Sequence, residues 1–320
     1  MSQMRVLVCG SNYGRAYITA LRREPGNYQL VGILAHGGAR SQRLAASNGV
    51  PLYCSTDELP GNIDLACAAM SSTAWPVVLQ LIRRGTHVLC EHPYPAASFK
   101  KALALAQKHN VQFHVNGHFA SLPAPQAFIR DCRQASQLAA PEFVELMATE
   151  RSLYGALDIM VAAVGGVPPL RVRVLSRRTK FVQLEGTLGR TPVRLSVQVS
   201  GKGRTSRLAD GSPAYLLDLR LTVAFPTGML TLLSIAGPVV WNKTLAHVPA
   251  NDSPLWTVTG DHDTQTAAEL GEQRTQANVE ALNSIRNSIL GRGTPETQQA
   301  KHILQVSKAW EAVGRQLYSA

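Results

Sequence analysis

The first part of the chain alternates short apolar runs with segments of helical periodicity. The apolar runs are RVLVCG, YQLVGILA, IDLACAAM, HVLCE and QFHVN, and the segments between them include GRAYITALRR, RSQRLAASNG and AWPVVLQLIRRG. Strands that alternate with helices form a parallel sheet with helices on both faces. The pattern therefore predicts an α/β domain of the Rossmann type, with a doubly wound parallel sheet, over residues 1–118.

The pattern changes after residue 118. Helices are predicted near 124–137 and 150–164, and two more near 266–290 and 295–318. Between these pairs stand the strand candidates RVRVLSRR, KFVQLEG, TPVRLSVQVS, YLLDLRLTVAF and MLTLLSIAG. A run of strands bracketed by helices predicts an α+β domain with a largely antiparallel sheet over residues 119–320.

The composition is that of a globular protein, since 45% of the 320 residues are apolar and 17% are charged. The five cysteines include no Cys-x-x-Cys pair, which predicts reduced, buried thiols and no metal centre. The uncharged stretch 221–241 is interrupted by Pro226-Thr227-Gly228 and by Gly237-Pro238, which favours a buried hairpin over a membrane span. The chain starts without a secretory signal pattern, so we expect a cytoplasmic protein.

The chain is basic, with 32 Lys and Arg against 21 Asp and Glu and a formal net charge of +11. It contains no zinc-finger spacing, basic-region helix or RNA-binding aromatic motif, so nucleic acid is not the expected partner. The basic residues either form a solvated surface or attract an acidic or phosphorylated partner.

A glycine turn follows the first predicted strand. Gly10 and Gly14 bracket Ser11, Asn12 and Tyr13 where the first helix begins. Such a turn lets backbone N–H groups at a helix N-terminus approach a pyrophosphate, so these five residues are candidate cofactor contacts. Asn12 stands where a second glycine is usual.

The second predicted strand ends at Ala35, without the acid that accepts hydrogen bonds from the ribose of NAD. Cationic and hydroxyl donors to a 2′-phosphate follow it: His36, Arg40 and Ser41. An exposed basic helix start is the alternative explanation. We predict NADPH rather than NADH as the cofactor.

Polar residues also follow the later strands of this domain. Ser71, Ser72 and Thr73 come after the run IDLACAAM, where they cap the next helix, contact the cofactor, or do both. Glu91-His92-Pro93 closes the run HVLCE, and Asn116 closes the run QFHVN. Because ligands bind at the carboxyl ends of parallel strands, we expect these residues in one site.

Together, the glycine turn, Glu91-His92-Pro93 and Asn116 resemble the glucose-fructose oxidoreductase, inositol dehydrogenase and MocA superfamily. Its members usually carry Glu-Lys-Pro, with the lysine beside the nicotinamide, and an Asp and a His four residues apart on a helix of the second domain. Here the lysine is replaced by His92, and the helix carries Asp158 but Ala162 four residues on. The missing bases argue against oxidation of an alcohol.

A narrower resemblance is to the thiazolinyl imide reductases of siderophore biosynthesis, which also carry His before the Pro. It lies in GARSQRLAASNGVPLYCS, ACAAMSSTA, GTHVLCEHP, RSLYGALDIMVAAVG and GPVVW, and so spans both domains. It implies NADPH-dependent reduction of a thiazoline C=N bond on a substrate that is tethered to a carrier domain of a nonribosomal peptide synthetase. Carrier domains are commonly acidic, which suits a basic chain.

The same resemblance implies a homodimer formed through the exposed face of the second-domain sheet, and no nucleic-acid or membrane partner. The substrate contacts that it implies are Tyr94, Phe119, Tyr154, Asp158 and Trp241.

Reduction of a C=N bond needs a proton on nitrogen as well as a hydride on carbon. An imidazole with a pKa near 6.5 supplies a proton at neutral pH more readily than an ammonium group, so His92 is the predicted general acid. Helix capping or ribose binding is the alternative role. The family also implies a Tyr shortly after Asn116 as a second proton donor, but this chain has Phe119 at that position. The further donor candidates are then His118, water, Tyr94 or Tyr154.

Two other functions stay open. One is an NADP-dependent oxidoreductase of the same superfamily that acts on a sugar, polyol or tetrapyrrole. The other is a regulatory or scaffold protein that binds NADP without turnover. This alternative stays open because Asn12 replaces a usual glycine and Phe119 replaces the family's tyrosine.

Overall fold

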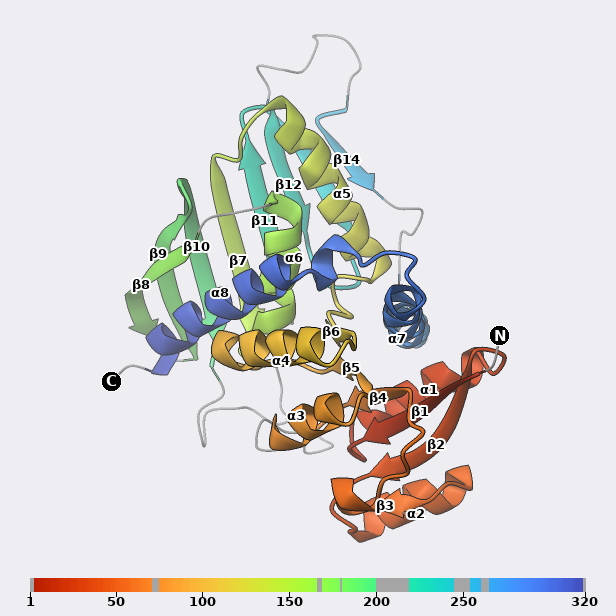
Figure 1. Ribbon diagram of the computed structural model, residues 1–320. Helices are drawn as coiled ribbons and strands as arrows, with labels where there is room; N and C mark the ends of the chain where they lie inside the picture. The colour runs from red at the N-terminus through yellow and green to blue at the C-terminus, as the bar shows by residue number, and fades with distance from the viewer. Residues whose placement is uncertain are drawn as a thin grey trace. The chain divides into compact units, whose positions relative to one another are not determined.

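The structure is a computed structural model that describes residues 3–70, 75–165, 169–178, 180–199, 219–244, 254–259 and 265–318 (Figure 1). The chain divides into two compact units. The first unit contains Met1–His118 and Gly271–Leu304, and the second contains Phe119–Leu270 and Gln305–Ala320. The chain therefore passes from the first unit to the second after His118, and a later segment returns to the first unit.

The first unit contains a six-stranded sheet in the order β3-β2-β1-β4-β5-β6, and all neighbouring strands are parallel. Its strands are β1 (Met4–Cys9), β2 (Tyr28–Leu34), β3 (Leu52–Tyr53), β4 (Leu65–Ala68), β5 (His87–Cys90) and β6 (Phe113–Val115). The connecting helices are α1 (Gly14–Arg23), α2 (Ala39–Asn48), α3 (Trp75–Arg83) and α4 (Ala96–Lys108), with a 3-10 turn, η1 (Thr56–Glu58), after β3. This strand order confirms the predicted Rossmann-type sheet.

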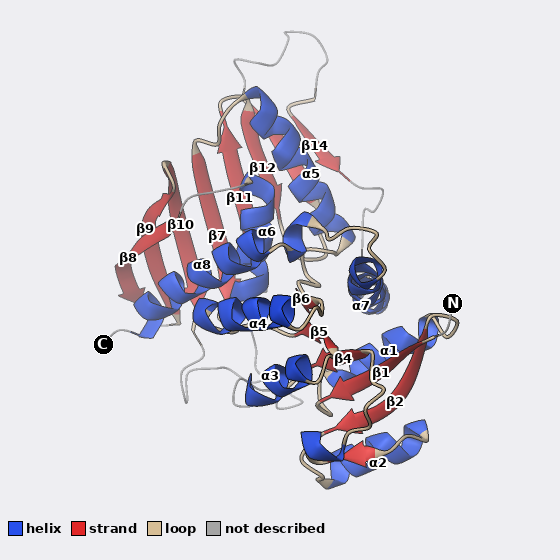
Figure 2. Cartoon of the chain, in the orientation of Figure 1, coloured by secondary structure: helices blue, strands red, loops and turns tan. Residues whose placement is uncertain are grey.

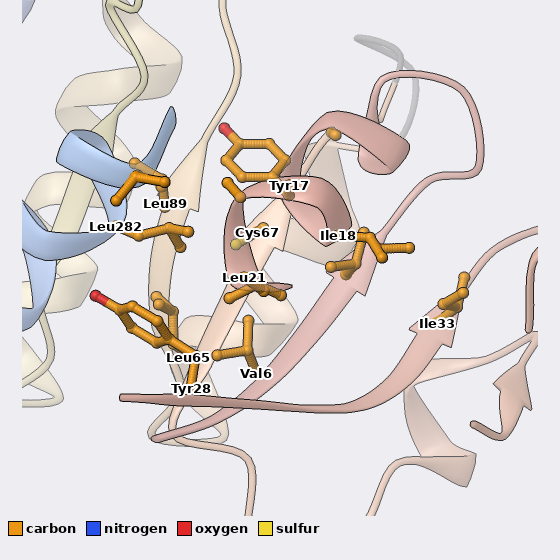
Figure 3. Close-up of a cluster of buried hydrophobic side chains, with 14 of the residues drawn as sticks. Val6, Tyr17, Ile18, Leu21, Tyr28, Ile33, Leu65, Cys67, Leu89 and Leu282 are labelled. Carbon is orange, nitrogen blue, oxygen red and sulfur yellow. The ribbon is translucent and has the colours of Figure 1, made fainter. Parts of the chain in front are cut away.

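The central strands β1 and β4 are apolar and buried over most of their length because helices cover both of their faces. On one face, Val6, Leu65 and Leu89 pack with residues of α1 and with Leu282 of a late helix, α7 (Ala267–Ile289) (Figure 3). A fully buried Leu or Val side chain contributes about 1.5–3 kcal/mol. The late helix is therefore part of the core of this unit.

A second late segment protects the edge of the same sheet. Gln298 lies in a 3-10 turn, η4 (Glu296–Gln298), and its side-chain amide pairs with the backbone of Val115 on the edge strand β6. The Val115 N–H donates to Gln298 Oε1, and Gln298 Nε2 donates to the Val115 carbonyl, each at 2.9 Å. These two bonds occupy backbone groups that an edge strand otherwise leaves open.

The second unit contains an eight-stranded sheet in the order β14-β13-β12-β11-β7-β10-β9-β8. Its strands are β7 (Phe143–Thr149), β8 (Leu170–Arg178), β9 (Phe181–Leu188), β10 (Thr191–Gln198), β11 (Leu219–Phe225), β12 (Gly228–Leu232), β13 (Val239–Lys243) and β14 (Trp256–Thr259). All neighbouring pairs are antiparallel except β7 and β10. The predicted, largely antiparallel α+β domain is confirmed.

Helices lie on one face of this sheet (Figure 2). α5 (Pro123–Leu138) contacts β11, β12 and β13, while α6 (Leu153–Val164) contacts β7 and β11. The last helix, α8 (Ala300–Tyr318), is tied to strand β8, because the Arg177 guanidinium donates to the carbonyl oxygens of Gln316 and Leu317 near its end.

The stretch 221–241 forms the predicted buried hairpin, with β11 and β12 joined at Pro226-Thr227. Three strands of the second unit were not predicted: β7, β13 and β14. The central strand β7 alternates buried Val144 and Leu146 with less buried residues, a period of two that is too short to stand out between two helices.

No helix in the described part of the chain is both long enough and apolar enough to cross a membrane. All five cysteines are free thiols, and four of them are buried as predicted: Cys9, Cys67, Cys90 and Cys132. The fifth, Cys54, is exposed, because it stands in the turn between β3 and η1.

Candidate active site

The glycine turn closes the gap between strands β1 and β4. Gly10 has φ +99°, and a Cβ atom there would lie 2.2 Å from the carbonyl oxygen of Ala69. At Gly14, the first residue of α1, a Cβ would lie 2.8 Å from Cγ1 of Val8. Both glycines are therefore required by close packing at the point where the strand order reverses, which is where Rossmann folds bind dinucleotides.

A cavity of about 870 Å³ opens at this turn. The predicted residues that line it are Gly10, Ser11, Asn12, Tyr13, His36, Arg40 and Ser41. Arg40 Nε donates to Ser11 Oγ at 3.2 Å, which links the end of β1 to the start of α2. The buried Ser41 hydroxyl donates to the Gly38 carbonyl at 2.7 Å, so it stabilises the first turn of α2.

The shape and donors of this cavity suit a nicotinamide dinucleotide. The glycine turn leaves room for a pyrophosphate at the N-terminus of α1, where no acidic residue stands in the first turn. His36 and Arg40 are exposed at its far end. Asp57 is the single acid among the described lining residues, and the sequence pattern did not single it out.

A hydrogen-bonded network occupies the carboxyl ends of β5 and β6. The Tyr17 hydroxyl donates to the Glu91 carboxylate. The Asn116 amide nitrogen lies 2.8 Å from Glu91 Oε1, 2.8 Å from the Tyr17 hydroxyl and 2.9 Å from Asn278 Oδ1. Burial raises the pKa of Glu91 to about 7, although the hydrogen bonds from Tyr17 and Asn116 oppose the shift.

Two histidines lie next to this network. The rings of His92 and His118 are stacked, with centroids 6.5 Å apart and planes inclined by 16°. One nitrogen of each ring and one oxygen of Glu91 all lie within 4.8 Å of one another. Burial, followed by the nearby charges of His92 and Arg274, lowers the pKa of His118 to about 3, so His118 is neutral at physiological pH.

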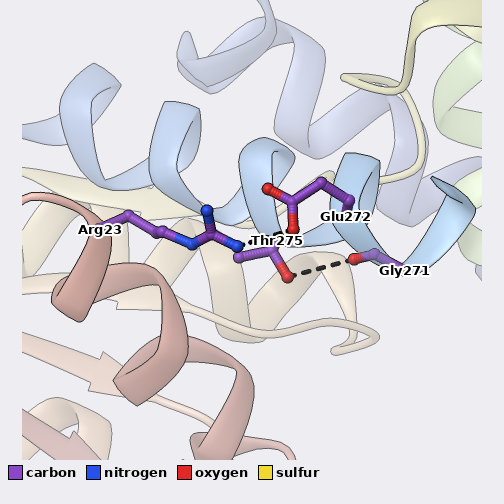
Figure 4. A network of polar contacts seen from close by, with 4 residues as sticks. All are labelled: Arg23, Gly271, Glu272 and Thr275. Atoms are coloured by element: carbon purple, nitrogen blue, oxygen red, sulfur yellow. Dashed lines mark hydrogen bonds and ion pairs between the residues drawn. The ribbon is translucent and has the colours of Figure 1, made fainter. Parts of the chain in front are cut away.

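Helix α7 supplies two further polar side chains, Arg274 and Asn278, which are four residues apart and so share one helix face. Both act on the Tyr13 hydroxyl by hydrogen bonding. The helix is joined to α1 by an ion pair of 2.7 Å between Arg23 and Glu272, shown in Figure 4 with the bond from Thr275 to the Gly271 carbonyl. The ion pair is exposed, so it contributes at most about 1 kcal/mol.

Several predicted residues lie elsewhere. Tyr94 is buried with its ring centroid 4.4 Å from that of Trp75 and 5.8 Å from that of Phe99, and so packs in the core of the first unit. Ser71, Ser72 and Thr73 lie outside the described residues.

The remaining predicted substrate contacts belong to the second unit. Phe119 lies against Gly155 of α6, where a Cβ would meet its ring at 2.6 Å. Tyr154 and Asp158 are buried in the same helix. Trp241 packs on the sheet, with its ring centroid 6.1 Å from that of Phe225.

Sequence reasoning missed Tyr17, Arg274 and Asn278. Tyr17 occupies an apolar position of α1, and its contact with Glu91 spans 74 residues. Asn278 meets Asn116 across 162 residues. No local pattern marks such positions, although the return of a late helix to the first unit is what brings two of them to the site.

Comparisons with known proteins match two parts of the chain to family models. Residues 4–117 match the family model described as an oxidoreductase family with an NAD-binding Rossmann fold. Residues 139–242 match the C-terminal model described as thiazolinyl imine reductase Irp3-like. A search of curated proteins gave no match.

Solved structures show the same fold at low sequence identity. GenD2 from gentamicin A biosynthesis, in complex with NAD, is 14% identical with a TM-score of 0.71, over 99% of this chain and 94% of that one. UDP-N-acetylglucosamine 3-dehydrogenase GnnA from Acidithiobacillus ferrooxidans is 17% identical with a TM-score of 0.72, over 99% and 98%. WlbA dehydrogenase from Bordetella pertussis, in complex with NADH and UDP-GlcNAcA, is 14% identical with a TM-score of 0.72, over 98% and 96%.

The fold and the site therefore define an oxidoreductase with a Rossmann domain for a nicotinamide cofactor. Residues 4–117 match the glucose-fructose oxidoreductase, inositol dehydrogenase and MocA family, and residues 139–242 match a C-terminal domain of the thiazolinyl imine reductase Irp3-like type.

Proposed function

We propose that the protein reduces a thiazoline C=N bond to a thiazolidine with NADPH, on a carrier-bound intermediate of nonribosomal siderophore biosynthesis. The observation that carries the proposal is the pairing of an Irp3-like domain with a histidine, His92, at the carboxyl end of β5. A family that oxidises alcohols needs a base at this edge, whereas an imine needs an acid.

The preference for NADPH is supported by the end of strand β2. The strand finishes at Leu34, no acid follows it, and the exposed His36 and Arg40 line the cavity instead. An exposed guanidinium binds a phosphate through bidentate hydrogen bonds and is always charged. The contact of Arg40 with Ser11 holds it at the cavity.

The protein has to bind the cofactor, orient the imine and deliver a proton to its nitrogen. When bound, the reduced nicotinamide supplies the hydride. His92 stands beside His118, which is neutral because its pKa is low and therefore cannot donate as an imidazolium. His92 is therefore the proposed general acid for the imine nitrogen.

The proposed partner is an acidic carrier domain that presents the substrate on a phosphopantetheine arm. The net charge of +11 favours this encounter by long-range attraction. Raising the salt concentration should then slow turnover of the carrier-bound substrate and leave a free thiazoline analogue unaffected.

The proposed homodimer is supported by the sheet face opposite the helices of the second unit. Met229 and Trp256 flank Asn242 on this face and are 49% and 60% exposed, and Val258, two residues on, is 44% exposed. Exposed apolar side chains in one patch favour a protein contact. Light scattering of the wild type and of Trp256→Asp tests it, since the variant should be monomeric.

The test of the function is NADPH oxidation with a thiazoline thioester surrogate. Replacing His92 with Phe should lower the rate by about 10²–10⁴. His109→Phe is the matched control, because it removes a histidine at the C-terminus of α4 in the same unit. Oxidation only with a carbonyl compound would support a sugar, polyol or tetrapyrrole oxidoreductase, and tight binding without turnover would support a regulatory or scaffold protein.

A further inference from the structure

The Tyr13 phenol reaches the catalytic edge from the glycine turn. Tyr13 is the residue before α1, and its hydroxyl lies 3.4 Å from Nδ1 of His118. The two ring centroids are 5.7 Å apart. The turn position explains why a residue here borders the cofactor cavity, but it does not explain why the side chain is a phenol in contact with a buried imidazole.

The charge state of His118 restricts what this imidazole can do. Its low pKa, caused by burial and by His92 and Arg274, prevents it from storing a proton as an imidazolium. A neutral imidazole still has a donor and an acceptor nitrogen. A neutral imidazole can pass a proton onward without becoming charged if one ring nitrogen releases a proton while the other ring nitrogen receives one. This transfer requires a proton donor next to the receiving nitrogen.

Tyr13 fits that requirement. Burial and the charge of Glu91 raise the pKa of the Tyr13 phenol, so it stays protonated through the physiological range. Arg274 and Asn278 act in the opposite direction, through charge and hydrogen bonding, and would stabilise the phenolate once it forms. The phenol of Tyr17 packs edge-on at a centroid distance of 5.9 Å. The charged or titratable neighbours of the pair are thus Glu91, His92, Tyr17 and Arg274.

We propose that Tyr13 and His118 form a proton relay that serves the imine nitrogen alongside His92, an inference that rests on the proposed function. The Nε2–H bond of His118 breaks as the new N–H bond forms on the substrate nitrogen. The O–H bond of Tyr13 breaks as Nδ1 takes up its proton. The phenolate is left beside Arg274 and regains a proton from solvent, while the imidazole is neutral throughout.

The relay also accounts for Phe119, where the resemblance implies a tyrosine. The chain supplies the phenol from the β1–α1 turn rather than from the segment after β6. Tyr13 acts through His118, so it is a positioning and proton-supplying residue rather than a direct contact of the substrate.

Kinetics against pH test the relay. A phenol donor keeps the wild-type kcat level up to about pH 9, whereas an imidazolium donor loses activity above about pH 7. Tyr13→Phe should therefore lower kcat about 100-fold near pH 8.5 but far less near pH 6, where an imidazolium donor is active, with KM for the thiazoline changed little. Tyr28→Phe is the matched control, because it removes a buried phenol that donates to Asn283 at 2.8 Å in the same unit.

The tautomer of His118 is a second measurement that needs no turnover. With ¹⁵N-labelled histidine, the wild type should show His118 with its proton on Nε2 and no titration between about pH 5 and 8. Tyr13→Phe should shift the Nδ1 resonance, and Tyr28→Phe should not. An unchanged pH profile and an unchanged Nδ1 resonance in Tyr13→Phe would overturn the relay. If Tyr13→Phe shifts the Nδ1 resonance of His118 but the wild type reduces no thiazoline, the contact between Tyr13 and His118 is supported and the proposed function is contradicted.

Discussion

Replacing Arg40 with Ala should change the choice between NADPH and NADH. Arg40 is exposed at the end of the cofactor cavity, and its Nε donates to Ser11 Oγ at 3.2 Å. Because β2 ends without an acid, the end of this strand provides no carboxylate that selects for the bare ribose hydroxyl of NADH. The variant therefore removes the group that we propose to distinguish the two cofactors.

The size of the effect follows from the exposure of Arg40. Two unit charges about 4 Å apart interact by about 1 kcal/mol in bulk water, which is the limit that applies to a fully solvated, exposed side chain. A phosphate monoester carries a charge of about −2 at neutral pH, so the contact is worth about 2 kcal/mol. That energy corresponds to about a 30-fold weaker affinity for NADPH. Affinity for NADH, which lacks the phosphate, should change less than about twofold by the same reasoning.

Calorimetric titration with both cofactors, at low and high salt, measures this difference. Arg83→Ala is the matched control, since it removes an exposed arginine at the end of α3 that does not line the cavity. Its NADPH affinity should stay at the wild-type level. Equal weakening of NADPH and NADH by Arg40→Ala, or no weakening of either, would refute the assignment of Arg40 to the 2′-phosphate.

Two further predictions concern the scaffold of the site. His114, buried at the centre of β6, has its pKa lowered by burial from 6.5 to about 4, so it favours the neutral form in the folded state. The contribution of His114 to stability is present above about pH 6.5 and is lost as the pH falls towards 4, by about 3 kcal/mol in total. Urea unfolding of His114→Phe across this range should therefore show a smaller loss of stability at low pH than the wild type. Gly10→Ala would place a Cβ 2.2 Å from a carbonyl oxygen at a φ of +99°, which should destabilise the protein by about 2 kcal/mol or more and weaken cofactor binding. Gly26→Ala, where a Cβ meets nothing within 4 Å, should leave both the melting temperature and the cofactor affinity unchanged; equal loss in the two variants would contradict the packing argument.

The Rossmann part of the fold was predictable because its signals are local. Strand β4 is buried along its whole length, so it appears in the sequence as an unbroken apolar run. Gly10 and Gly14 are forced by contacts next to the strand that precedes them. The carboxyl edge of a parallel sheet then gathers Glu91, His92 and Asn116 from separate strands, as the strand order requires.

The rest of the site depends on contacts that no local pattern records. Tyr17 and Asn278 meet Asn116 across 99 and 162 residues, and each looks like an ordinary helix position in the sequence. Tyr94 shows the opposite case, because it follows the Glu91-His92-Pro93 motif and was predicted to contact the substrate. It packs in the core instead, edge-on against Phe99 and in contact with Trp75. Strand β7 was missed because seven residues of period two are a weak signal.

The central claim is that the protein moves a hydride to the carbon of a thiazoline C=N bond. Incubation of the enzyme with a thiazoline thioester and NADPH that carries deuterium at the transferable position, followed by mass spectrometry, tests it directly. The account predicts a thiazolidine that contains a single deuterium on the ring carbon, with an equal amount of NADPH oxidised. Recovery of the thiazoline without deuterium, while the same enzyme oxidises NADPH with a carbonyl compound, would contradict it.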